Sequence, residues 1–285
     1  MFGRSALALV VITSAVALGG ACATSGHETK EDAQVGAARI SMAHELIERG
    51  DWNGAFALLN QMHQAHPDDP EVLTLRGIVY RERGLYSDAE ADLRAALKVA
   101  PASPEAHAAL GILFDLQMRP GAEAEHKEAV RLAPSNPAYL NNLGFSLFLR
   151  EHFKQAIAEY EKAARLAPLS HRVRTNMGFA YAALGDLPSA AREFRMGGSE
   201  VDADNNLGFA YERRGDLANA FELYLQAVKI DPTAVRARSN LVHAAAVLGR
   251  PVPPEVAPPP ASPPPSTPPT SISPPDLSKQ PVATP

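Results

Sequence analysis

A glycine recurs along this chain at nearly constant spacing, and this repeat restricts the possible folds more than any other feature. Each glycine lies in an apolar stretch that is followed by a short polar turn and a second stretch rich in alanine. Self-similarity at a period of about 20 to 50 residues indicates stacked units that share one continuous core. The glycines are Gly77, Gly111, Gly144, Gly178 and Gly208, and the steps between them are 34, 33, 34 and 30 residues.

The clearest unit covers residues 141–168. It reads Asn-Asn-Leu-Gly-Phe-Ser-Leu-Phe, then a short turn, then Ala156, Tyr160, Ala163 and Pro168. Small residues allow two helices to cross at close range, larger ones fill the space between crossings, and the proline ends the second helix. This order resembles the tetratricopeptide repeat (TPR). The resemblance implies an all-α TPR solenoid of about six helix-turn-helix repeats with a C-terminal capping helix.

The solenoid is expected to occupy residues 36–249. Its first repeat, with helices at 36–49 and 52–66, has lost most of the landmark residues. The fifth repeat stops at Gly197-Gly198 without its proline, so we expect its second helix to be about one turn shorter. A last helix at 234–248 is predicted to cap the final repeat.

Composition excludes several functions. The chain has 285 residues, a formal net charge of −5 and one cysteine. This charge provides no electrostatic basis for nucleic-acid binding, and a single cysteine permits no internal disulfide. After residue 22, no apolar run approaches the roughly 20 residues that a membrane-spanning helix needs.

Residues 1–21 resemble a lipoprotein signal peptide. Arg4 supplies a positive n-region, Ser5–Leu18 forms an apolar h-region, and three small residues lead directly into Cys22. The order resembles a bacterial lipobox, although its leucine lies four residues before the cysteine instead of three. The resemblance implies that Cys22 carries acyl chains and becomes the mature N-terminus.

The residues after Cys22 bear on localisation. Ala23 replaces the aspartate that commonly retains such lipoproteins in the inner membrane, so the resemblance implies the cell outer membrane, facing the periplasm. The alternative is an ordinary signal cleaved near Ala23, which leaves a soluble periplasmic protein. Residues 22–35 are polar and lack helical periodicity, so we expect a flexible tether there.

Residues 250–285 form a separate, proline-rich segment. From Pro251 on, it holds 15 of the chain's 25 prolines. Runs of proline oppose helix and core formation and favour an extended polyproline II conformation, so we expect a disordered tail. The segment is either a solvating tail without a partner, or a spacer or ligand for a polyproline-binding groove.

No catalytic constellation is recognisable in the sequence. It contains no phosphate-binding loop, no Gly-X-Ser-X-Gly elbow and no His-Glu-X-X-His motif. His63 and His66 lie one helical turn apart, but histidines near a helix C-terminus more often interact with the helix dipole than with a metal. We therefore expect no enzyme, no cofactor and no metal.

Two residue types recur beside the landmark glycine in the C-terminal half. An asparagine lies two residues before it and a phenylalanine follows it, so both share one face of the first helix. In a stacked solenoid the first helices line the concave wall, so these ladders predict a peptide-binding groove. Side-chain amides bind an extended backbone whatever its sequence, and aromatic faces add apolar area. The predicted groove residues are Asn142, Phe145, Phe148, Asn176, Phe179, Asn206, Phe209 and Asn240, flanked by Arg172, Arg213 and Arg236 for a carboxylate or acidic ligand.

Packing within the solenoid is the alternative for both ladders. The phenylalanines also suit contacts between adjacent first helices, and the asparagines suit hydrogen bonds to a neighbouring helix. The second and third repeats carry Leu75 and Ala109 where later repeats carry asparagine. We therefore expect a polarised groove whose ligand-binding half covers residues 137–249.

The combination of a lipobox-like cysteine with these repeats resembles one group of TPR lipoproteins. The relevant residues are Asn141–Phe145, the shortened repeat at Gly197-Gly198, Asn205–Tyr211 and Gly215–Leu217. They resemble TadD-type lipoproteins of the Flp (tight adherence) pilus system, cousins of the type IV pilus pilotins that help outer-membrane secretins assemble. The resemblance implies a non-enzymatic, lipid-anchored scaffold that binds an extended or helical segment of a protein, such as a secretin or pilus machinery. The alternative is a generic periplasmic TPR adaptor in envelope biogenesis.

Overall fold

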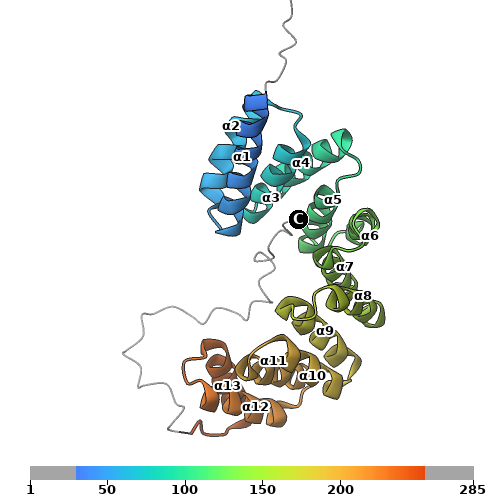
Figure 1. Cartoon of the computed structure of the whole chain (residues 1–285). Coiled ribbons are helices and arrows are strands. Elements are labelled where there is room, and N and C mark those ends of the chain that lie inside the picture. The colour runs from blue at the N-terminus through green and yellow to red at the C-terminus, as the bar shows by residue number, and fades with distance from the viewer. Residues whose placement is uncertain (1–29, 254–285) are drawn as a thin grey trace, which may run out of the picture. The chain divides into compact units, whose positions relative to one another are not determined.

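The computed structural model describes residues 30–253, and every regular element among them is a helix (Figure 1). The predicted signal peptide, Cys22, the start of the tether and the tail from residue 254 on lie outside the described residues. The chain divides into two compact units, residues 1–39 and 40–285. The described part of the first unit is the beginning of α1, and the second unit holds all the other helices.

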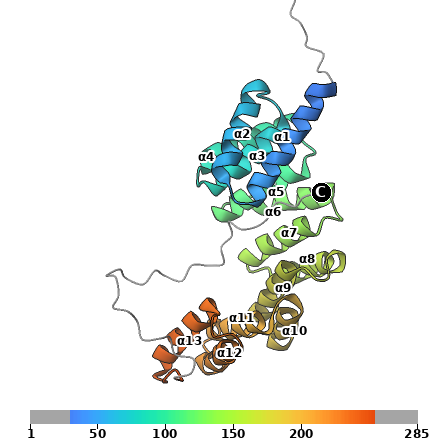
Figure 2. The ribbon, with the colours of Figure 1, turned by 60° about the vertical axis from the view of Figure 1, so that its left-hand side comes forward.

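The described residues form thirteen helices joined by short turns. In the second unit each helix from α2 on packs against the next one along the chain, as the two views in Figures 1 and 2 show. The helices are α1 (Lys30–Glu48), α2 (Trp52–Ala65), α3 (Pro70–Glu82), α4 (Tyr86–Val99), α5 (Pro104–Leu116), α6 (Ala122–Leu132), α7 (Pro137–Leu149), α8 (Phe153–Leu166), α9 (His171–Leu184), α10 (Leu187–Gly197), α11 (Glu200–Arg213), α12 (Leu217–Ile230) and α13 (Val235–Leu248).

The helices alternate between two roles. The odd-numbered helices are the first helices of successive repeats, and each contacts the next first helix in addition to its hairpin partner, from α3 through to α13. The last of them, α13, has no hairpin partner and packs on α11 and α12. This order confirms the predicted all-α TPR solenoid with a C-terminal capping helix.

Three first helices begin with the same type of N-terminal cap. The side chains of Asp69, Ser103 and Asn136 each accept a hydrogen bond from a backbone N–H of the following turn, at 2.9, 3.2 and 2.9 Å. A proline follows each of them at the first helical position, where no N–H is needed for the helix. These residue pairs therefore start α3, α5 and α7 at equivalent points of their repeats.

The landmark glycine is the point of closest approach within each hairpin. A Cβ added to Gly144 would lie 2.6 Å from the ring of Tyr160 in α8, and one added to Gly208 would lie 2.7 Å from Tyr224 in α12. Both rings are 0% exposed, so neither has room to move away. The recurrence of glycine in the sequence thus reflects a contact that admits no side chain.

The third repeat makes this contact with a histidine. Gly111 faces the imidazole of His126, which is 1% exposed and has its Nε2 2.9 Å from Asp115 Oδ2. Asp115 also accepts hydrogen bonds from Ser146 Oγ at 3.0 Å and from Arg150 Nη1 at 2.8 Å. This buried network connects the third repeat to the fourth.

Two helix boundaries differ from the average repeat. α1 begins at Lys30, six residues before the predicted start, so residues 30–35 of the predicted tether are helical. They include Lys, Glu, Gln and Ala, which favour helix, and no Gly or Pro interrupts them. α10 ends at Gly197, as the Gly197-Gly198 pair predicted, and has 11 residues, like α6, against 14 in α8 and α12.

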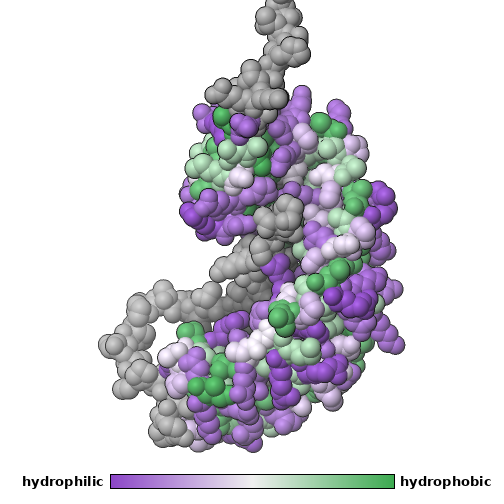
Figure 3. All heavy atoms as spheres, viewed as in Figure 1, coloured by the Kyte–Doolittle hydropathy of each residue, from purple (hydrophilic) through white to green (hydrophobic). Residues whose placement is uncertain are grey.

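The surface is mixed in character. Figure 3 shows polar and charged side chains over most of the visible surface, with small apolar areas between them. Leu169, Val235 and Met118 are the most exposed large apolar residues, and they come from different repeats. Within residues 30–253, no helix has both the length and the apolar character that a membrane crossing requires.

Candidate functional site

The predicted groove residues lie mainly on one side of the first helices, which we call the ladder face. It comprises the positions six residues before, two before and one after the landmark glycine. At about 100° per residue, these positions point roughly 100° to 160° away from the glycine. Because each glycine contacts the second helix of its own repeat, the ladder face is turned away from that helix.

Apolar packing closes the ladder face of α3 and fills one of its three positions in α5. Leu75 and Ile78 of α3 are 0% and 2% exposed and share a core cluster with residues of α1 and α2. Ala109 of α5 is also buried. The amide ladder begins with Asn142 in α7, so the face changes character between the third and fourth repeats.

Two of the four ladder asparagines bind a neighbouring first helix. Asn176 Nδ2 in α9 donates to Asn141 Oδ1 in α7 at 3.0 Å, and Asn240 Nδ2 in α13 donates to Asn205 Oδ1 in α11 at 2.9 Å. Both donors are half-buried and both acceptors are buried. One side-chain N–H of Asn176 and one of Asn240 therefore serve packing between first helices, as the alternative interpretation expected. The side-chain oxygens of these two residues take no part in the bonds.

The other two ladder asparagines have unmet hydrogen-bonding groups. Asn142 is 8% exposed, and its Oδ1 is buried without a donor. The adjacent Asn141 keeps a buried Nδ2 that donates to nothing. Asn206 is half-buried, and its amide has no hydrogen-bond partner within residues 30–253. Because buried polar groups are nearly always bonded, the two asparagines on the ladder face, Asn142 and Asn206, are candidate ligand contacts.

The phenylalanines form two separate groups. Phe179 of α9 and Phe209 of α11 meet at right angles with ring centroids 6.0 Å apart, so this pair joins adjacent first helices. Phe145 stacks on Phe148 within α7 at 6.5 Å, and Phe148 contacts Phe153 of α8 at 5.4 Å. All five rings are half-buried, so each packs inside the array and still leaves some apolar surface open.

The three flanking arginines differ in their partners. Arg236 Nη2 lies 3.6 Å from Asp202 Oδ1 in an exposed pair. Arg213 is exposed and Arg172 is half-buried, and neither has a hydrogen bond or ion pair among the residues the structure describes. Burial lowers the pKa of Arg172. A partly buried guanidinium without an anion is unfavourable, so Arg172 is the strongest anion-binding position of the three.

Sequence reasoning missed an acidic counterpart of Arg172 on the same face. Glu105 in α5 lies six residues before Gly111, the same ladder position that Arg172 holds before Gly178. Its Oε1 is buried without a donor, and burial together with nearby Glu71 raises the pKa of Glu105 to about 7. Both residues occupy the same position of the aligned repeats, and that shared position was the signal that could have revealed Glu105.

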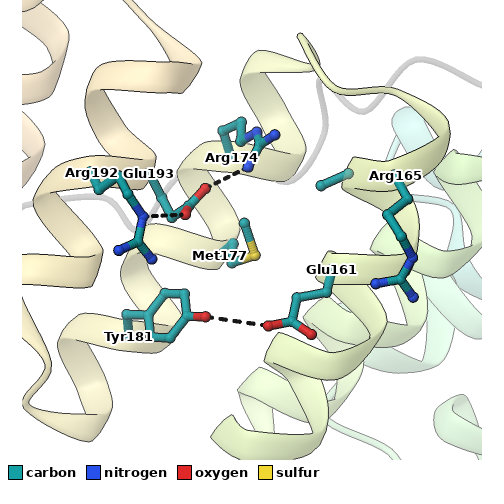
Figure 4. A pocket seen from close by; sticks show the side chains of 8 residues that line it. Glu161, Arg165, Arg174, Met177, Tyr181, Arg192 and Glu193 are labelled. Carbon is teal, nitrogen blue, oxygen red and sulfur yellow. Dashed lines mark hydrogen bonds and ion pairs between the residues drawn. The ribbon is translucent and has the colours of Figure 1, made fainter.

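A pocket of about 260 Å³ lies between α8, α9 and α10 (Figure 4). On one side of it Glu193 accepts hydrogen bonds from Arg174 Nη1 at 2.7 Å and from Arg192 Nε at 3.2 Å. On the other side Tyr181 OH lies 3.4 Å from Glu161 Oε1. Because most of these charged groups already have partners, we assign the pocket to the joint between the fourth and fifth repeats.

The ladder face carries groups that make non-covalent contacts. It offers amides, partly open aromatic rings and an unpaired guanidinium, which act through hydrogen bonds, apolar contact and charge. Within residues 30–253, no three or more His, Cys, Asp and Glu side chains are grouped to hold a metal ion.

Comparison with known proteins identifies the repeats. Tetratricopeptide repeat models match residues 46–113, 137–170 and 205–234. The chain carries tetratricopeptide repeats. The matched segments include α7 and α8 in full and the ladder residue Asn206, so the resemblance stated from the sequence is confirmed for the fold.

A curated relative adds a narrower similarity. The chain is 36% identical over 81 residues to the type IV pilus assembly protein PilF of Pseudomonas aeruginosa. The alignment covers 28% of this chain and 32% of PilF, so the chain spans about a third of the length of that relative.

Solved structures extend the likeness in fold. The structure reported for functional characterisation of Pseudomonas aeruginosa PilF has a TM-score of 0.59 at 18% identity and covers 75% of this chain and 100% of its own. PilW, described as a widely conserved type IV pilus biogenesis factor, has a TM-score of 0.62 at 19% identity and covers 73% and 99%. YrrB, described as a TPR protein with an unusual peptide-binding site, has a TM-score of 0.50 at 21% identity and covers 66% and 97%.

Proposed function

We propose that this chain is a non-enzymatic, lipid-anchored interaction scaffold of the cell envelope that assists assembly of a pilus or secretion apparatus. It holds an extended or helical segment of a protein partner along the ladder face of α7 to α13. The segment of 36% identity to PilF supports the pilus context, and the TPR fold supports the scaffold role.

One observation carries the binding role: the ladder face presents polar groups that nothing in the described part of the chain satisfies. Asn142 Oδ1, the Asn206 amide and the Arg172 guanidinium all lack partners there. Each new hydrogen bond to a ligand contributes about 0.5–1.5 kcal/mol net, and a bond to a charged group contributes more. A segment that crosses several repeats therefore gains affinity from several hydrogen bonds, each of which contributes a modest free energy.

The anchor rests on the sequence around Cys22, which lies outside the described residues. Acyl chains on this thiol would hold the protein at the outer membrane, because each buried methylene contributes about 0.8 kcal/mol. Cys22→Ser should move the protein from the membrane fraction to the soluble fraction and block processing of the signal. Unchanged fractionation of this variant would contradict lipid anchoring and leave the ladder-face role untouched.

The binding role is tested by partner capture. Crosslinking and pull-down from intact envelopes should recover less partner with Asn142→Ala plus Asn206→Ala than with the unmodified chain, at nearly unchanged helicity and melting temperature. Asn53→Ala is the matched control, because Asn53 is an exposed amide of α2 away from the ladder face. Equal capture by all three proteins would remove the amides from the binding site.

The pilus role is tested in cells. Deleting the gene should abolish secretin multimers or surface pili. If both stay at normal levels while the ladder variants still lose their partner, the protein is instead a general periplasmic adaptor.

A further inference from the structure

The charge of the ladder face changes sign between α3 and α9. The position six residues before the landmark glycine is Glu71 in α3 and Glu105 in α5, and it is Arg172 in α9. In α11 it is Asp202, which already pairs with Arg236 at 3.6 Å. In α7, between the acidic and basic helices, this position is the uncharged Ala138. One face of three consecutive first helices therefore runs from acid through neutral to base.

The acidic end lacks a cation. Glu105 is half-buried, and the charged group that acts on it most is Glu71, which has the same sign. Its Oε1 has no donor, although Ser103 Oγ caps the same helix end by accepting from Ala106 N at 3.2 Å. A carboxylate in this setting gains more from an external ammonium or guanidinium than an exposed carboxylate does.

The basic end lacks an anion. Arg172 is half-buried and makes no hydrogen bond or ion pair within residues 30–253. Arg174, on the same helix, is paired: it donates to Glu193 at 2.7 Å and to the carbonyl of Pro168 at 3.0 Å. Arg172 is thus the cation of this helix that remains available to a ligand.

A neutral group between the two ends is also unmet. In α7, Asn142 is 8% exposed with an Oδ1 that has no donor. Such an acceptor matches a backbone N–H of a polypeptide. An acid, an amide and a base on α5, α7 and α9 therefore all lack partners.

We propose that the ladder face from α5 to α9 takes a bipolar protein segment, with a Lys or Arg side chain at Glu105 and a carboxylate at Arg172. This inference rests on the proposed function, extends its site by one first helix to α5, and adds the charge order of the ligand. Helices packed about 8–10 Å apart place α5 and α9 roughly 20 Å apart. An extended chain covers this distance in about six residues. The partner segment therefore carries its two charges about six positions apart.

Four synthetic peptides of about twelve residues test the charge order, because this length exceeds the span between the two charged sites. All have capped ends and the same neutral, partly apolar backbone. The first carries one Lys and one Glu about six residues apart, the second has Gln in place of Lys, the third has Gln in place of Glu, and the fourth has Gln at both places. Fluorescence anisotropy with the purified full-length protein measures the four affinities.

The expected order is bipolar first, the two singly charged peptides next and the neutral peptide last. Glu105→Gln should weaken the two Lys-containing peptides about tenfold and leave the others unchanged. Arg172→Gln should do the same for the two Glu-containing peptides. Glu48→Gln and Arg165→Gln are matched controls, since both residues are exposed, lie off the ladder face and have no described partner.

The outcomes separate this inference from the proposed function. If the neutral peptide binds as tightly as the bipolar one, peptide binding stands and the charge order is wrong. If Glu105→Gln or Arg172→Gln weakens all four peptides equally, the residue acts through the fold, and the charge order is again wrong. If no peptide binds to the unmodified protein, the ladder face is not a peptide site and both proposals fail.

Discussion

Asn176 Nδ2 donates a 3.0 Å hydrogen bond to Asn141 Oδ1, which lies 35 residues earlier on the neighbouring first helix. Asn240 repeats this geometry with Asn205, again 35 residues earlier. In both cases the acceptor is the first residue of an Asn-Asn pair. The second residue of each pair lies on the ladder face and keeps unmet groups, so the two adjacent asparagines have different roles.

Replacement of the first asparagine should therefore reduce stability. Asn141→Ala removes the acceptor of Asn176 and leaves that amide half-buried without its partner, which we expect to lower the free energy of unfolding by about 1–3 kcal/mol. Asn206→Ala removes no hydrogen bond within the described residues and should stay within about 0.5 kcal/mol of the unmodified protein. Urea denaturation followed by circular dichroism measures both. Equal losses in the two variants would contradict the division of roles.

The sequence revealed the four asparagines of the ladder, but it did not reveal the different roles of the two residues in each Asn-Asn pair. The spacing from the landmark glycine places Asn142, Asn176, Asn206 and Asn240 on one face, and the repeat pattern gives that much directly. Which of two adjacent asparagines reaches the next helix depends on how the first helices are rotated against each other. That rotation depends on the packing of residues far apart in the chain, so it cannot be predicted from the pattern within one repeat.

Two tyrosines in equivalent positions allow a matched comparison. Tyr160 and Tyr224 are both 0% exposed, and each packs on the glycine of its repeat. The Tyr160 hydroxyl has no partner, whereas Tyr224 OH donates to Glu212 Oε2 at 2.6 Å. Tyr160→Phe should keep or raise the melting temperature, since it removes an unmet buried hydroxyl.

Tyr224→Phe should have the opposite effect. It removes a hydrogen bond to a carboxylate and should lower stability by about 1–3 kcal/mol. Differential scanning calorimetry of the two single variants, at one pH and protein concentration, gives the comparison. A loss of stability in Tyr160→Phe as large as that in Tyr224→Phe would show that the Tyr160 hydroxyl is hydrogen-bonded in the folded protein.

The joint between the third and fourth repeats depends on one buried carboxylate. Asp115 is 5% exposed and binds His126, Ser146 and Arg150. Asp115→Ala leaves these groups without their common partner and should cost about 3–5 kcal/mol, as is usual when one side of a buried charged pair is removed. Asp68→Ala, at an exposed site, is the control and should be close to neutral.

Cooperativity of unfolding provides a second readout for the same variant. If Asp115 joins the repeats, its loss should broaden the transition or split it in two, because neighbouring repeats of a solenoid are coupled through their interfaces. A single sharp transition at an unchanged midpoint would exclude the joint role.

His126 shows where sequence reasoning reached its limit. Equivalent repeats place an aromatic or large apolar residue opposite the glycine, and His126 departs from that pattern opposite Gly111. The role of His126 does not follow from the sequence pattern, because its network includes residues of α5 and α7 that are distant in the sequence. The same limit applies to Glu105, whose importance depends on the absence of a cation near it in space.

Glu105 makes a prediction about pH. Burial and the nearby Glu71 raise the pKa of Glu105 from 4.5 to about 7. Between about pH 4.5 and 7 the folded state therefore binds more protons than the unfolded state, so stability from this group falls as pH rises through that window and is constant above it. Tyr139, the other titratable group near Glu105, stays protonated throughout, since burial and Glu105 raise its pKa to about 12.

Glu105→Gln should remove this pH dependence. The variant should match the unmodified protein near pH 4 and exceed its free energy of unfolding by an amount on the order of 3 kcal/mol at pH 8. His44, whose Nε2 lies 4.0 Å from Glu71, is present in both proteins, so its titration cancels in the difference. Urea denaturation at a series of pH values measures the effect. A difference that is the same at pH 4 and pH 8 would mean that the Glu105 carboxyl is not perturbed. A gain in stability together with weaker binding of the Lys-containing peptides would show that Glu105 is kept for its ligand at the expense of the fold.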